Sequence, residues 1–392
     1  ADLFAGAGGT STGAKKAIEK DLGGEMDLVA INHWDVAIAT HQKNHPAARH
    51  YVEDVNIANP REIVTEGWLD LLMASPECTY YSRARGGKPV HDQGRMNPWA
   101  IIRWLTDLNV RCLLVENVWE FTGWGPLLPD GRPDPKHKGE YFAAWYKAIK
   151  ALGYRAEYHE LNAADYGDAT TRERFFLIAR KDRRHIIWPE PTHSRTGEIT
   201  MFGHLPKWRA AREIIDWANP GRSLLDDPKY IKHPLVVNSR RRIARGLEKF
   251  GGPLAPLYIR LLGLDDMAGA GESGAARPFV MGKNGNSPAY RGVDEPVPTV
   301  TCDGRSVLIE PVLEKVKDGQ VDPRRLVLIN GEPYLLDIRF RMLNNPELAR
   351  AMGFEDEETK YEFCGNQEDV TRQIGNAVCV NLAKALVLSI LK

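Results

Sequence analysis

Short apolar runs alternate with amphipathic segments from residue 1 to about residue 185. The apolar runs, which predict β-strands, are MDLVAIN (26–32), WLDLLMAS (68–75), RCLLVENV (111–118), AEYHELN (156–162) and ERFFLIAR (173–180). Several are apolar at consecutive positions, as in parallel strands that are covered on both faces. The segments between them have helical spacing. This alternation predicts an α/β fold with a doubly wound, mostly parallel sheet.

The alternation ends near residue 194, and a different composition follows. Residues 195–335 are rich in Gly, Pro and Arg, which predicts a second, smaller, loop-rich domain with short strands. Helical patterns return at NPELARAMGF (345–354) and NQEDVTRQIGNAVCVNLAKALVLSIL (366–391). We therefore predict a catalytic and cofactor-binding domain at 1–194, a second domain at 195–335, and a segment at 336–392 that returns to the first.

Composition excludes several classes of protein. Lys plus Arg equals Asp plus Glu at 52 each, so a nucleic-acid partner would have to bind a local cluster of charge. The 5 cysteines are scattered, with no pair at metal-ligand spacing, which argues against a disulfide framework and a metal site. No run of about 20 apolar residues indicates a membrane span. We expect a cytoplasmic protein, although the chain begins inside a predicted strand, which is consistent with a missing N-terminal piece.

A glycine-rich turn joins the first strand to the first helix in DLFAGAGGTSTGAKKAIE (2–19). Glycines at 6, 8 and 9 allow a ligand to approach the backbone, and a helix amino terminus attracts negative charge. The pattern differs from G-x-G-x-x-G, which favours a single adenosine over a dinucleotide. Such turns also join strands to helices without binding anything, so the turn alone leaves both interpretations open.

Two further residues follow the next strands. Trp34 can stack on a flat base, and Asp54 can accept a hydrogen bond from an exocyclic amine. A core position for Trp34 and a capping role for Asp54 are equally ordinary alternatives.

Cys78 stands in ASPECTYYSRARGG (74–87), where a predicted strand gives way to a polar segment. Free cysteines are usually buried, but Arg83 and Arg85 nearby favour a thiolate. The sequence at this point is compatible with either a nucleophile or a buried thiol.

Charged side chains also mark two later strands. Glu116 lies at the carboxyl end of the strand in LLVENVWEF (113–121), where open α/β sheets place their ligands. A carboxyl group there can hold a proton for the ring nitrogen of a substrate. Arg172 and Arg174 alternate ahead of another apolar run, so both can point into one site. Taken singly, each of these charges also fits a solvated strand end.

In order and together, these stretches resemble the DNA cytosine C5 methyltransferase family. DLFAGAGG resembles its S-adenosylmethionine loop, SPECT its Pro-Cys nucleophile motif, ENV its Glu-Asn-Val motif, and TTRERFFLIA its Gln-x-Arg-x-Arg strand. RMLNNPELARAMGF (341–354) and RQIGNAVCVNLAKAL (372–386) are similar to its carboxyl-terminal segments. The unmatched centre, 195–335, lies where the family has its target-recognition domain. The resemblance thus covers residues 2–386.

The resemblance implies methyl transfer from S-adenosylmethionine to C5 of a flipped-out cytosine in double-stranded DNA. A monomeric enzyme of a bacterial or phage restriction-modification system, associated with the nucleoid, fits this expectation. The implied catalytic residues are Cys78, Glu116, Arg172 and Arg174. The implied cofactor residues are Phe4, Gly6, Gly8, Trp34, Asp54 and Asn376. The implied DNA contacts are Ser82, Arg83, Arg85, Arg240, Arg241 and Arg242.

The chain departs from the family pattern at several positions. Glu77 stands where many members have Pro before the Cys, and His33 stands where an acidic residue usually binds the ribose. Thr170 replaces the Gln of the arginine strand, and Cys379 replaces the Pro after Asn-Ala-Val. Two alternatives keep the same fold: an RNA cytosine-5 methyltransferase, and a catalytically silent DNA-binding regulator.

Overall fold

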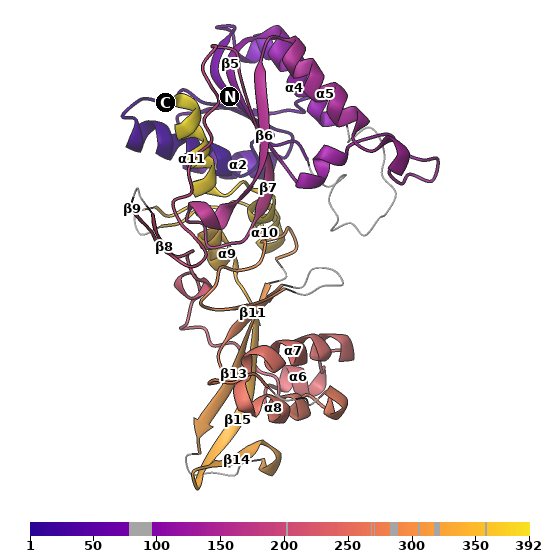
Figure 1. The fold of residues 1–392 in the computed structure, drawn as a ribbon, viewed down its shortest axis with the longest axis vertical. Helices are drawn as coiled ribbons and strands as arrows, with labels where there is room; N and C mark the ends of the chain where they lie inside the picture. The colour runs from indigo at the N-terminus through magenta and orange to yellow at the C-terminus, as the bar shows by residue number, and fades with distance from the viewer. Residues whose placement is uncertain are drawn as a thin grey trace. The chain divides into compact units, whose positions relative to one another are not determined.

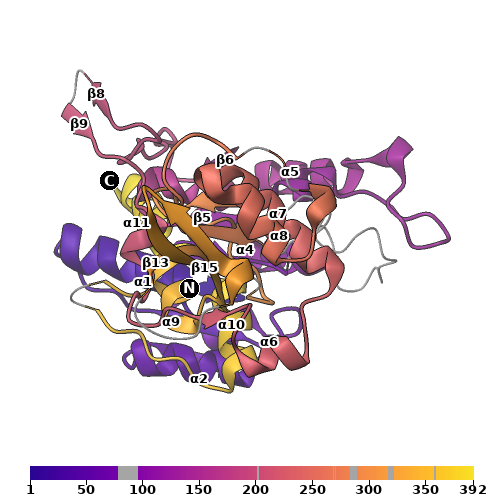
Figure 2. The same cartoon turned by 90° about the horizontal axis from the view of Figure 1, so that it is seen from below.

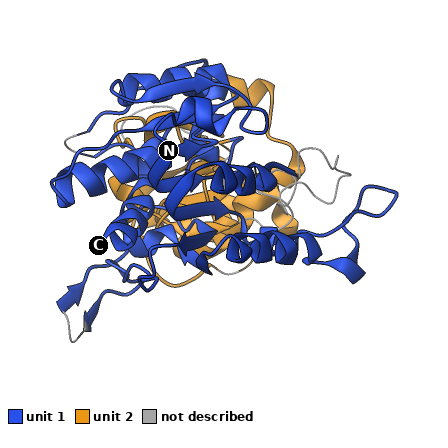
Figure 3. Cartoon of the chain, turned by 90° about the horizontal axis from the view of Figure 1, so that it is seen from above, with its two compact units in different colours: residues 1–208, 301–303, 349–392 blue, residues 209–300, 304–348 orange. Residues whose placement is uncertain are grey.

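The computed structural model describes residues 1–77, 96–200, 203–267, 269, 271–282, 289–304, 306–316, 322–356 and 359–392. These residues form two compact units (Figure 3). Unit 1 comprises residues 1–208, 301–303 and 349–392, and unit 2 comprises residues 209–300 and 304–348. The domain limits at 194 and 335 stay a prediction. The compact units change at 208 and 348 instead, because the last two strands of unit 1 and the longest strand of unit 2 extend past those limits.

Unit 1 contains a 7-stranded sheet in the order β3-β2-β1-β4-β5-β7-β6. Figure 1 labels its strands β5, β6 and β7. Its strands are β1 (Asp2–Leu3), β2 (Val29–Asn32), β3 (Arg49–Val52), β4 (Trp68–Ala74), β5 (Asn109–Asn117), β6 (Arg155–Asn162) and β7 (Glu173–Arg180). Strands β1 to β5 pair in parallel, and β7 runs antiparallel to both β5 and β6. The predicted α/β fold is confirmed. A short hairpin of β8 (Glu198–Thr200) and β9 (Gly203–Leu205) also belongs to this unit.

Helices cover both faces of this sheet. They are α1 (Gly9–Lys15), which continues as the π-helix η1 (Lys16–Asp21), α2 (Asp35–Asn44), α3 (Pro60–Ile63), α4 (Asn97–Asp107), α5 (Glu140–Ala151), α10 (Gln367–Asn376) and α11 (Val380–Leu391). Single turns of 3-10 helix are η4 (Trp119–Gly123), η5 (Pro135–His137) and η6 (Ala163–Tyr166). Helices α3, α4 and α5 form one core with alternate residues of the strands, in which Trp104, Trp145 and Phe175 are fully buried. Helices α1 and α11 pack together so closely that a Cβ on Gly13 would lie 2.6 Å from that of Ala383.

The carboxyl-terminal helices were expected from the sequence as one helical pattern, and the structure divides them. Residues Gln367–Leu391 are long and apolar enough to cross a membrane, with a mean hydropathy of 1.8 in a window that is 61% buried in the protein. The helix is interrupted between Asn376 and Val380. The buried carboxylate of Asp168 accepts hydrogen bonds from the amides of Asn381 and Leu382, at 3.3 and 3.1 Å, and so caps α11. These contacts make α11 a core helix of unit 1.

Unit 2 is more regular than its composition indicated. Its antiparallel sheet has the order β10-β15-β13-β11-β12, with β14 paired to β15. The strands are β10 (Arg222–Ser223), β11 (Phe279–Gly282), β12 (Tyr290–Gly292), β13 (Ser306–Lys315), β14 (Leu326–Ile329) and β15 (Glu332–Met342), and the helices are α6 (Pro228–Lys232), α7 (Val237–Phe250) and α8 (Ala255–Leu261). Helices α7 and α8 lie side by side (Figure 2) and share a core with β11, β13 and β15. Single 3-10 turns are η7 (Ala211–Glu213), η8 (Gly252–Leu254), η9 (Asp265–Met267) and η10 (Pro323–Arg325), and α9 (Asn345–Ala351) spans the limit to unit 1.

Unit 2 contains a buried ion pair between Arg341 and Glu347. Arg341 donates two hydrogen bonds to the carboxylate of Glu347, at 2.8 and 2.7 Å, and their side chains are 8% and 0% exposed. The same carboxylate accepts from the amides of Asn344 and Asp216, at 2.7 and 2.8 Å. Every oxygen of this buried acid therefore has partners, which is the condition for a buried charge to be tolerated.

We expect Glu347→Ala to lower the free energy of unfolding by about 3–5 kcal/mol, because it leaves the Arg341 guanidinium buried without its counter-charge. Urea unfolding followed by circular dichroism measures the change. Glu314→Ala is the matched control, since Glu314 pairs with Arg339 at 2.8 Å on the same sheet but is 57% exposed. Exposed pairs contribute at most about 1 kcal/mol. Equal losses in both variants would contradict the prediction.

Candidate active site

The sheet topology gathers chemistry-bearing residues at one edge of unit 1. Strands β1, β4 and β5 are parallel neighbours, so their carboxyl ends meet there. Because β7 runs antiparallel to β5, its amino end lies at the same edge, and Asn117 pairs with Phe175. Glu116, at the end of β5, is thus brought next to Arg174, at the start of β7. This arrangement places ligand-binding groups where open α/β sheets normally have their sites.

Glu116 and Arg174 form an ion pair at this edge, with Arg174 Nε 3.4 Å from Glu116 Oε1. Residue Glu116 is 8% exposed, and burial raises the pKa of its carboxyl, an effect that the charges of Arg174 and Arg172 partly oppose. Arg172 is itself 3% exposed. The structure therefore brings three of the predicted catalytic side chains into one electrostatic group, in which burial raises the pKa of the acid.

Asn117 connects β5 to the segment before the predicted nucleophile. Its Nδ2 donates to the carbonyl of Pro76 at 3.2 Å, and its Oδ1 accepts from the amide of Val118 at 2.8 Å. Asn117 is fully buried, so it fixes the path of the chain from β4 to Glu77. Cys78 lies outside the described residues, as do the predicted DNA contacts Ser82, Arg83 and Arg85.

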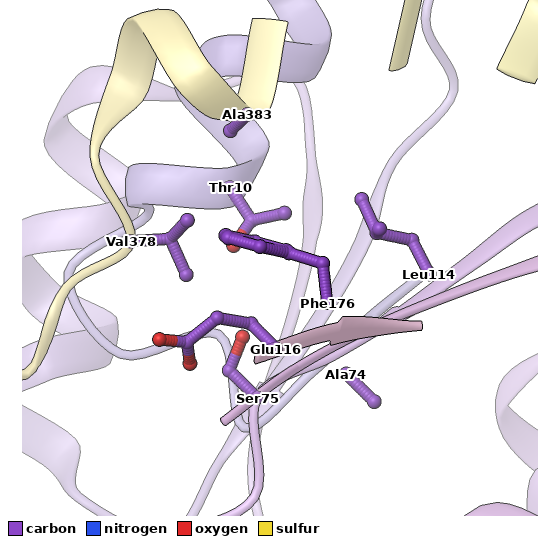
Figure 4. Close-up of a pocket in the computed structure, with 8 residues that line it drawn as sticks. All are labelled: Thr10, Ala74, Ser75, Leu114, Glu116, Phe176, Val378 and Ala383. Atoms are coloured by element: carbon purple, nitrogen blue, oxygen red, sulfur yellow. The ribbon is translucent and has the colours of Figure 1, made fainter. Parts of the chain in front are cut away.

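A small pocket opens beside this acid, as Figure 4 shows. Its lining residues come from α1, β4, β5, β7 and the carboxyl-terminal segment, and are Thr10, Ala74, Ser75, Leu114, Glu116, Phe176, Val378 and Ala383. In Figure 4 the Glu116 carboxyl and the Ser75 hydroxyl are the polar groups that lie close to each other, with the Phe176 ring on the apolar side. The pocket therefore joins the predicted catalytic acid to the first turn of α1.

The glycine turn between β1 and α1 has an uncommon backbone. Phe4, Gly6 and Gly8 have φ values of 61°, 53° and 89°, in the left-handed region that non-glycine residues rarely adopt. A Cβ on Gly9 would lie 2.2 Å from the carbonyl oxygen of Val378, so the turn packs directly on the carboxyl-terminal segment. Strained backbone of this kind is concentrated at ligand sites. All three predicted cofactor residues of the turn thus lie on one irregular backbone segment.

Trp34 and Asp54 follow β2 and β3. Trp34 is partly buried, and the guanidinium of Arg372, on α10, lies 4.7 Å from its ring centroid. Asp54 is exposed and accepts from the amide and the side chain of Asn56, each at 2.9 Å. The Asp54 side chain therefore makes a local, turn-forming contact, of the kind that the capping alternative predicts. Its role toward a ligand stays a prediction.

Asn376 is the last residue of α10, and its Oδ1 accepts from Cys302 Sγ at 2.8 Å. Residues 301–303 and α10 both belong to unit 1, so this contact is internal to that unit.

The sequence of the whole chain, residues 1–392, matches the family model for C-5 cytosine-specific DNA methylase. The chain belongs to this family. It is a DNA (cytosine-5) methyltransferase, as its resemblance to that family implied.

Curated relatives agree over the full length of this methylase. Type II methyltransferase M.NgoPII of Neisseria gonorrhoeae is 24% identical over 392 residues, which cover 100% of this chain and 94% of the relative. M.FnuDI of Fusobacterium nucleatum is 25% identical, covering 97% and 90%. M.AgeI of Thalassovita gelatinovora is 29% identical over 198 residues, but this match covers only 49% of the chain and 42% of that relative.

Solved structures share the fold. A Spodoptera frugiperda DNMT2 mutant superposes with a TM-score of 0.57 at 15% identity, covering 100% of this chain and 98% of that one. A putative DNA modification methyltransferase encoded in an Escherichia coli prophage has a TM-score of 0.53 at 19% identity, covering 100% and 97%. At these identities the likeness concerns the fold alone, and it agrees with the α/β sheet described above.

Two departures of the methylase from its family pattern lie side by side. His33 Nε2 is 3.7 Å from Glu77 Oε1, and the two side chains are 55% and 37% exposed. A carboxylate therefore does lie beside position 33, supplied from the end of β4 instead of the end of β2. Sequence spacing does not reveal this pairing, because the two residues come from strands on opposite sides of β1.

The predicted DNA contacts of the methylase in unit 2 lie on helix α7. Arg240 is half-buried and donates to the carbonyl of Leu262 at 2.6 Å. Arg241 pairs with Asp266 at 3.3 Å, with both side chains largely exposed. Arg242 contributes its carbonyl oxygen to the hydroxyl of Tyr290 at 2.9 Å. Arg240 thus has a structural contact within unit 2, and binding of DNA by these arginines stays a prediction.

Sequence analysis missed a buried histidine network beneath the glycine turn of the methylase. Ser11 donates to the buried carboxylate of Asp2 at 2.6 Å, and His41 Nε2 lies 3.0 Å from the same Ser11 hydroxyl. His41 Nδ1 is 2.8 Å from His50 Nε2, and His45 Nε2 is 3.0 Å from the Thr12 hydroxyl. The sequence feature that could have indicated this network is the spacing of His41 and His45, which lie one helical turn apart on the same face.

Burial sets the protonation of this network. Burial lowers the pKa of His41 well below its usual range, with His45 and His50 adding to the shift. Burial lowers the pKa of His45 to about 4, with Lys15 and His50 adding to the shift. Burial raises the pKa of Asp2 to about 6, an effect that its hydrogen bond from Ser11 opposes. The histidines are therefore neutral in the folded methylase near neutral pH.

We expect the folded methylase to lose stability as pH falls from 7 to 5. The unfolded chain protonates His45 near pH 6.5 and the folded chain only near pH 4, so the unfolded state binds more protons in between. Asp2 acts in the opposite direction, since its folded pKa is raised. His45→Gln should remove about 2 kcal/mol of the pH-dependent loss, measured as urea unfolding at both pH values. His204→Gln, on exposed strand β9, is the control, and an unchanged slope in His45→Gln would contradict the prediction.

Proposed function

We propose that this methylase transfers a methyl group to C5 of a cytosine flipped out of double-stranded DNA, at a specific sequence, through a bond between Cys78 Sγ and C6 of the ring. The pairing of Glu116 with Arg174, beside the segment that leads to Cys78, is the observation that supports this assignment. C5 of cytosine is a poor nucleophile while the ring is aromatic. Addition of a thiolate to C6 removes that aromaticity and gives C5 enamine character.

Glu116 has the role of a proton donor to N3 of the cytosine. Its burial favours the protonated carboxyl, which can donate a hydrogen bond or the proton itself as Cys78 adds to C6. We assign Arg174 to O2 of the same ring, where its charge stabilises the negative charge that develops, with Arg172 in support. Once C5 has taken the methyl group, a base removes the C5 proton, the electron pair left on C5 expels the Cys78 sulfur from C6, and N3 returns its proton to Glu116.

The methyl donor of the family is S-adenosylmethionine, which supplies an electrophilic methyl group when bound. The residues of this chain fit such a group, because the turn with a left-handed backbone at Gly6 and Gly8 leads directly to Thr10, which lines the pocket that contains Glu116. The residues that we propose to hold it are Phe4, Gly6, Gly8, Trp34, Asp54 and Asn376. Trp34 would lie against the adenine, and Asp54 would accept from its amine.

A base inside a duplex hides C6 from any thiol, so the target must leave the stack, at a cost of a few kcal/mol. We assign contacts with the DNA to two sets of polar and basic residues, Ser82, Arg83 and Arg85 in one and Arg240, Arg241 and Arg242 in the other. Arginine clusters usually contact phosphates, so none is assigned to a base.

We further propose that the enzyme acts as a monomer, on bacterial or phage DNA in the cytoplasm, within a restriction-modification system. The bacterial type II relatives support this setting. The family, C-5 cytosine-specific DNA methylase, supports DNA over RNA as the substrate.

Methyl transfer from labelled S-adenosylmethionine, offered duplex DNA and tRNA in parallel, tests the proposal. We expect label in the DNA alone, and conversion-resistant cytosines at one recurring sequence after bisulfite treatment. Label in the tRNA alone would establish the RNA enzyme instead. No transfer, together with no adduct on DNA that contains 5-fluorocytosine, would establish the silent regulator.

A further inference from the structure

We infer that Tyr361 is a positioning residue for the methyl donor, because its hydroxyl fixes the glycine turn from the opposite end of the chain. Tyr361 is 5% exposed, and its hydroxyl donates to the carbonyl oxygen of Ala7, in the middle of the turn. Burial raises the pKa of Tyr361, so the hydroxyl keeps its proton and acts as a donor. This inference rests on the proposed role of the turn in binding S-adenosylmethionine.

The segment that contains Tyr361 is itself held in place along helix α2. Asn44 donates to the carbonyl of Glu362 at 2.9 Å and accepts from its amide at 3.0 Å. The amide of Cys364 donates to the Thr40 hydroxyl at 2.8 Å. Gln373, on α10, donates to the carbonyl of Cys364 at 2.8 Å. With contacts on both sides, this segment presents the Tyr361 hydroxyl in one fixed direction.

The turn is held at the next residue as well. Thr12 donates from its hydroxyl to the carbonyl of Gly8 at 2.6 Å. A Cβ on Gly8 would lie 2.9 Å from both His41 Cδ2 and the Tyr361 hydroxyl, so the turn is enclosed between these two rings. Two consecutive carbonyl oxygens, of Ala7 and Gly8, are therefore bound by hydroxyl groups.

Fixing a carbonyl oxygen also fixes the rest of its peptide plane, because the peptide unit is rigid. The N–H of the Ala7–Gly8 plane belongs to Gly8 and donates to the carbonyl of Ala5 at 2.9 Å, so it is not offered to a ligand. The N–H of the next plane, whose carbonyl oxygen Thr12 binds, belongs to Gly9, the first residue of α1, and such groups are what these turns offer to a ligand. Without the Tyr361 hydroxyl, the buried Ala7 carbonyl loses a partner, and the turn that leads to Gly9 is held less firmly. The ligand must then order the turn when it binds, which weakens its affinity.

Tyr361→Phe removes only this hydroxyl, and Tyr154→Phe is its matched control. Tyr154 is 3% exposed, and its hydroxyl donates to the carbonyl of Val110 at 2.7 Å, at the opposite end of β5 from Glu116. Titration calorimetry of the full chain with S-adenosylmethionine gives the dissociation constant of each protein. From the net contribution of one hydrogen bond, we expect about 3- to 10-fold weaker binding for Tyr361→Phe and less than about 2-fold for Tyr154→Phe. The KM for S-adenosylmethionine should rise in parallel while kcat at saturation stays within about 2-fold.

Equal dissociation constants for the two variants, with equal melting temperatures, would overturn the inference. If Tyr361→Phe does not fold, Thr12→Val tests the same idea at the Gly8 carbonyl, and unchanged binding in that variant would overturn it as well. Failure of the wild-type chain to bind S-adenosylmethionine is a distinct result. It would refute the proposed cofactor site, and the role of Tyr361 with it.

Discussion

Glu116→Gln is expected to lower methyl transfer to cytosine by about 10²- to 10⁴-fold, the usual contribution of a positioned general acid. The amide has nearly the shape of the carboxyl and can still contact Arg174, but it cannot deliver a proton to N3. Because burial raises the pKa of Glu116, the wild-type rate should fall as pH rises through that pKa, and the variant should lose this dependence. Single-turnover transfer from labelled S-adenosylmethionine, followed over a series of pH values, measures both effects.

The matched control for this change is Glu157→Gln. Glu157 lies on β6 in the same sheet, is exposed, and accepts from Trp188 Nε1 at 3.3 Å. Its amide variant should retain the wild-type rate and pH profile. A Glu116→Gln enzyme that keeps more than about a tenth of the wild-type rate would exclude the general-acid role.

Cys78→Ala is expected to abolish methylation, with a loss of at least about 10⁴-fold, because no other group can form the bond to C6. The wild-type enzyme should also form a stable adduct with duplex DNA that contains 5-fluorocytosine, since fluorine cannot leave C5 as a proton does. Denaturing gel electrophoresis detects that adduct. The Cys78→Ala enzyme should give none.

Cys112→Ala is the control for the thiol. Cys112 is fully buried in the first half of β5, away from the carboxyl end where Glu116 lies. Its replacement should leave both transfer and the adduct in place. Methylated cytosines made by a Cys78→Ala enzyme would show that another residue is the nucleophile.

Local pattern predicted the catalytic half of the fold well, and each of the five apolar runs in residues 1–185 is a strand of one sheet. For β2, β4, β5 and β7 the reason is that buried strands need continuous apolar residues, which such runs supply, whereas β6 is a mostly exposed edge strand. A charged residue at the end of such a run, such as Glu116, then stands out. Burying its charge costs free energy unless the group has a partner or is protonated.

Unit 2 was harder to predict because its order depends on pairing between distant segments. Strands β13 and β15 pair from Val307 with Met342 to Lys315 with Tyr334. Each strand contains a proline, which in a sequence usually indicates a turn. Antiparallel strands with one solvated face carry a weaker apolar signal than buried parallel strands. The sequence therefore indicated short strands among loops, where the structure has a sheet with strands of up to 11 residues.

The amino-acid sequence by itself determined the strand–helix alternation, the glycine turn and the motifs that resemble a cytosine methyltransferase, since each depends on residues that are neighbours along the chain. Only the tertiary structure decided which distant groups meet. It reversed β7 so that Arg174 reaches Glu116, paired His33 with Glu77, and brought Tyr361 to the carbonyl of Ala7. Hydrogen bonds and ion pairs form between groups within a few ångströms in space, whatever their separation along the chain. The spacing of residues in the sequence therefore does not predict them.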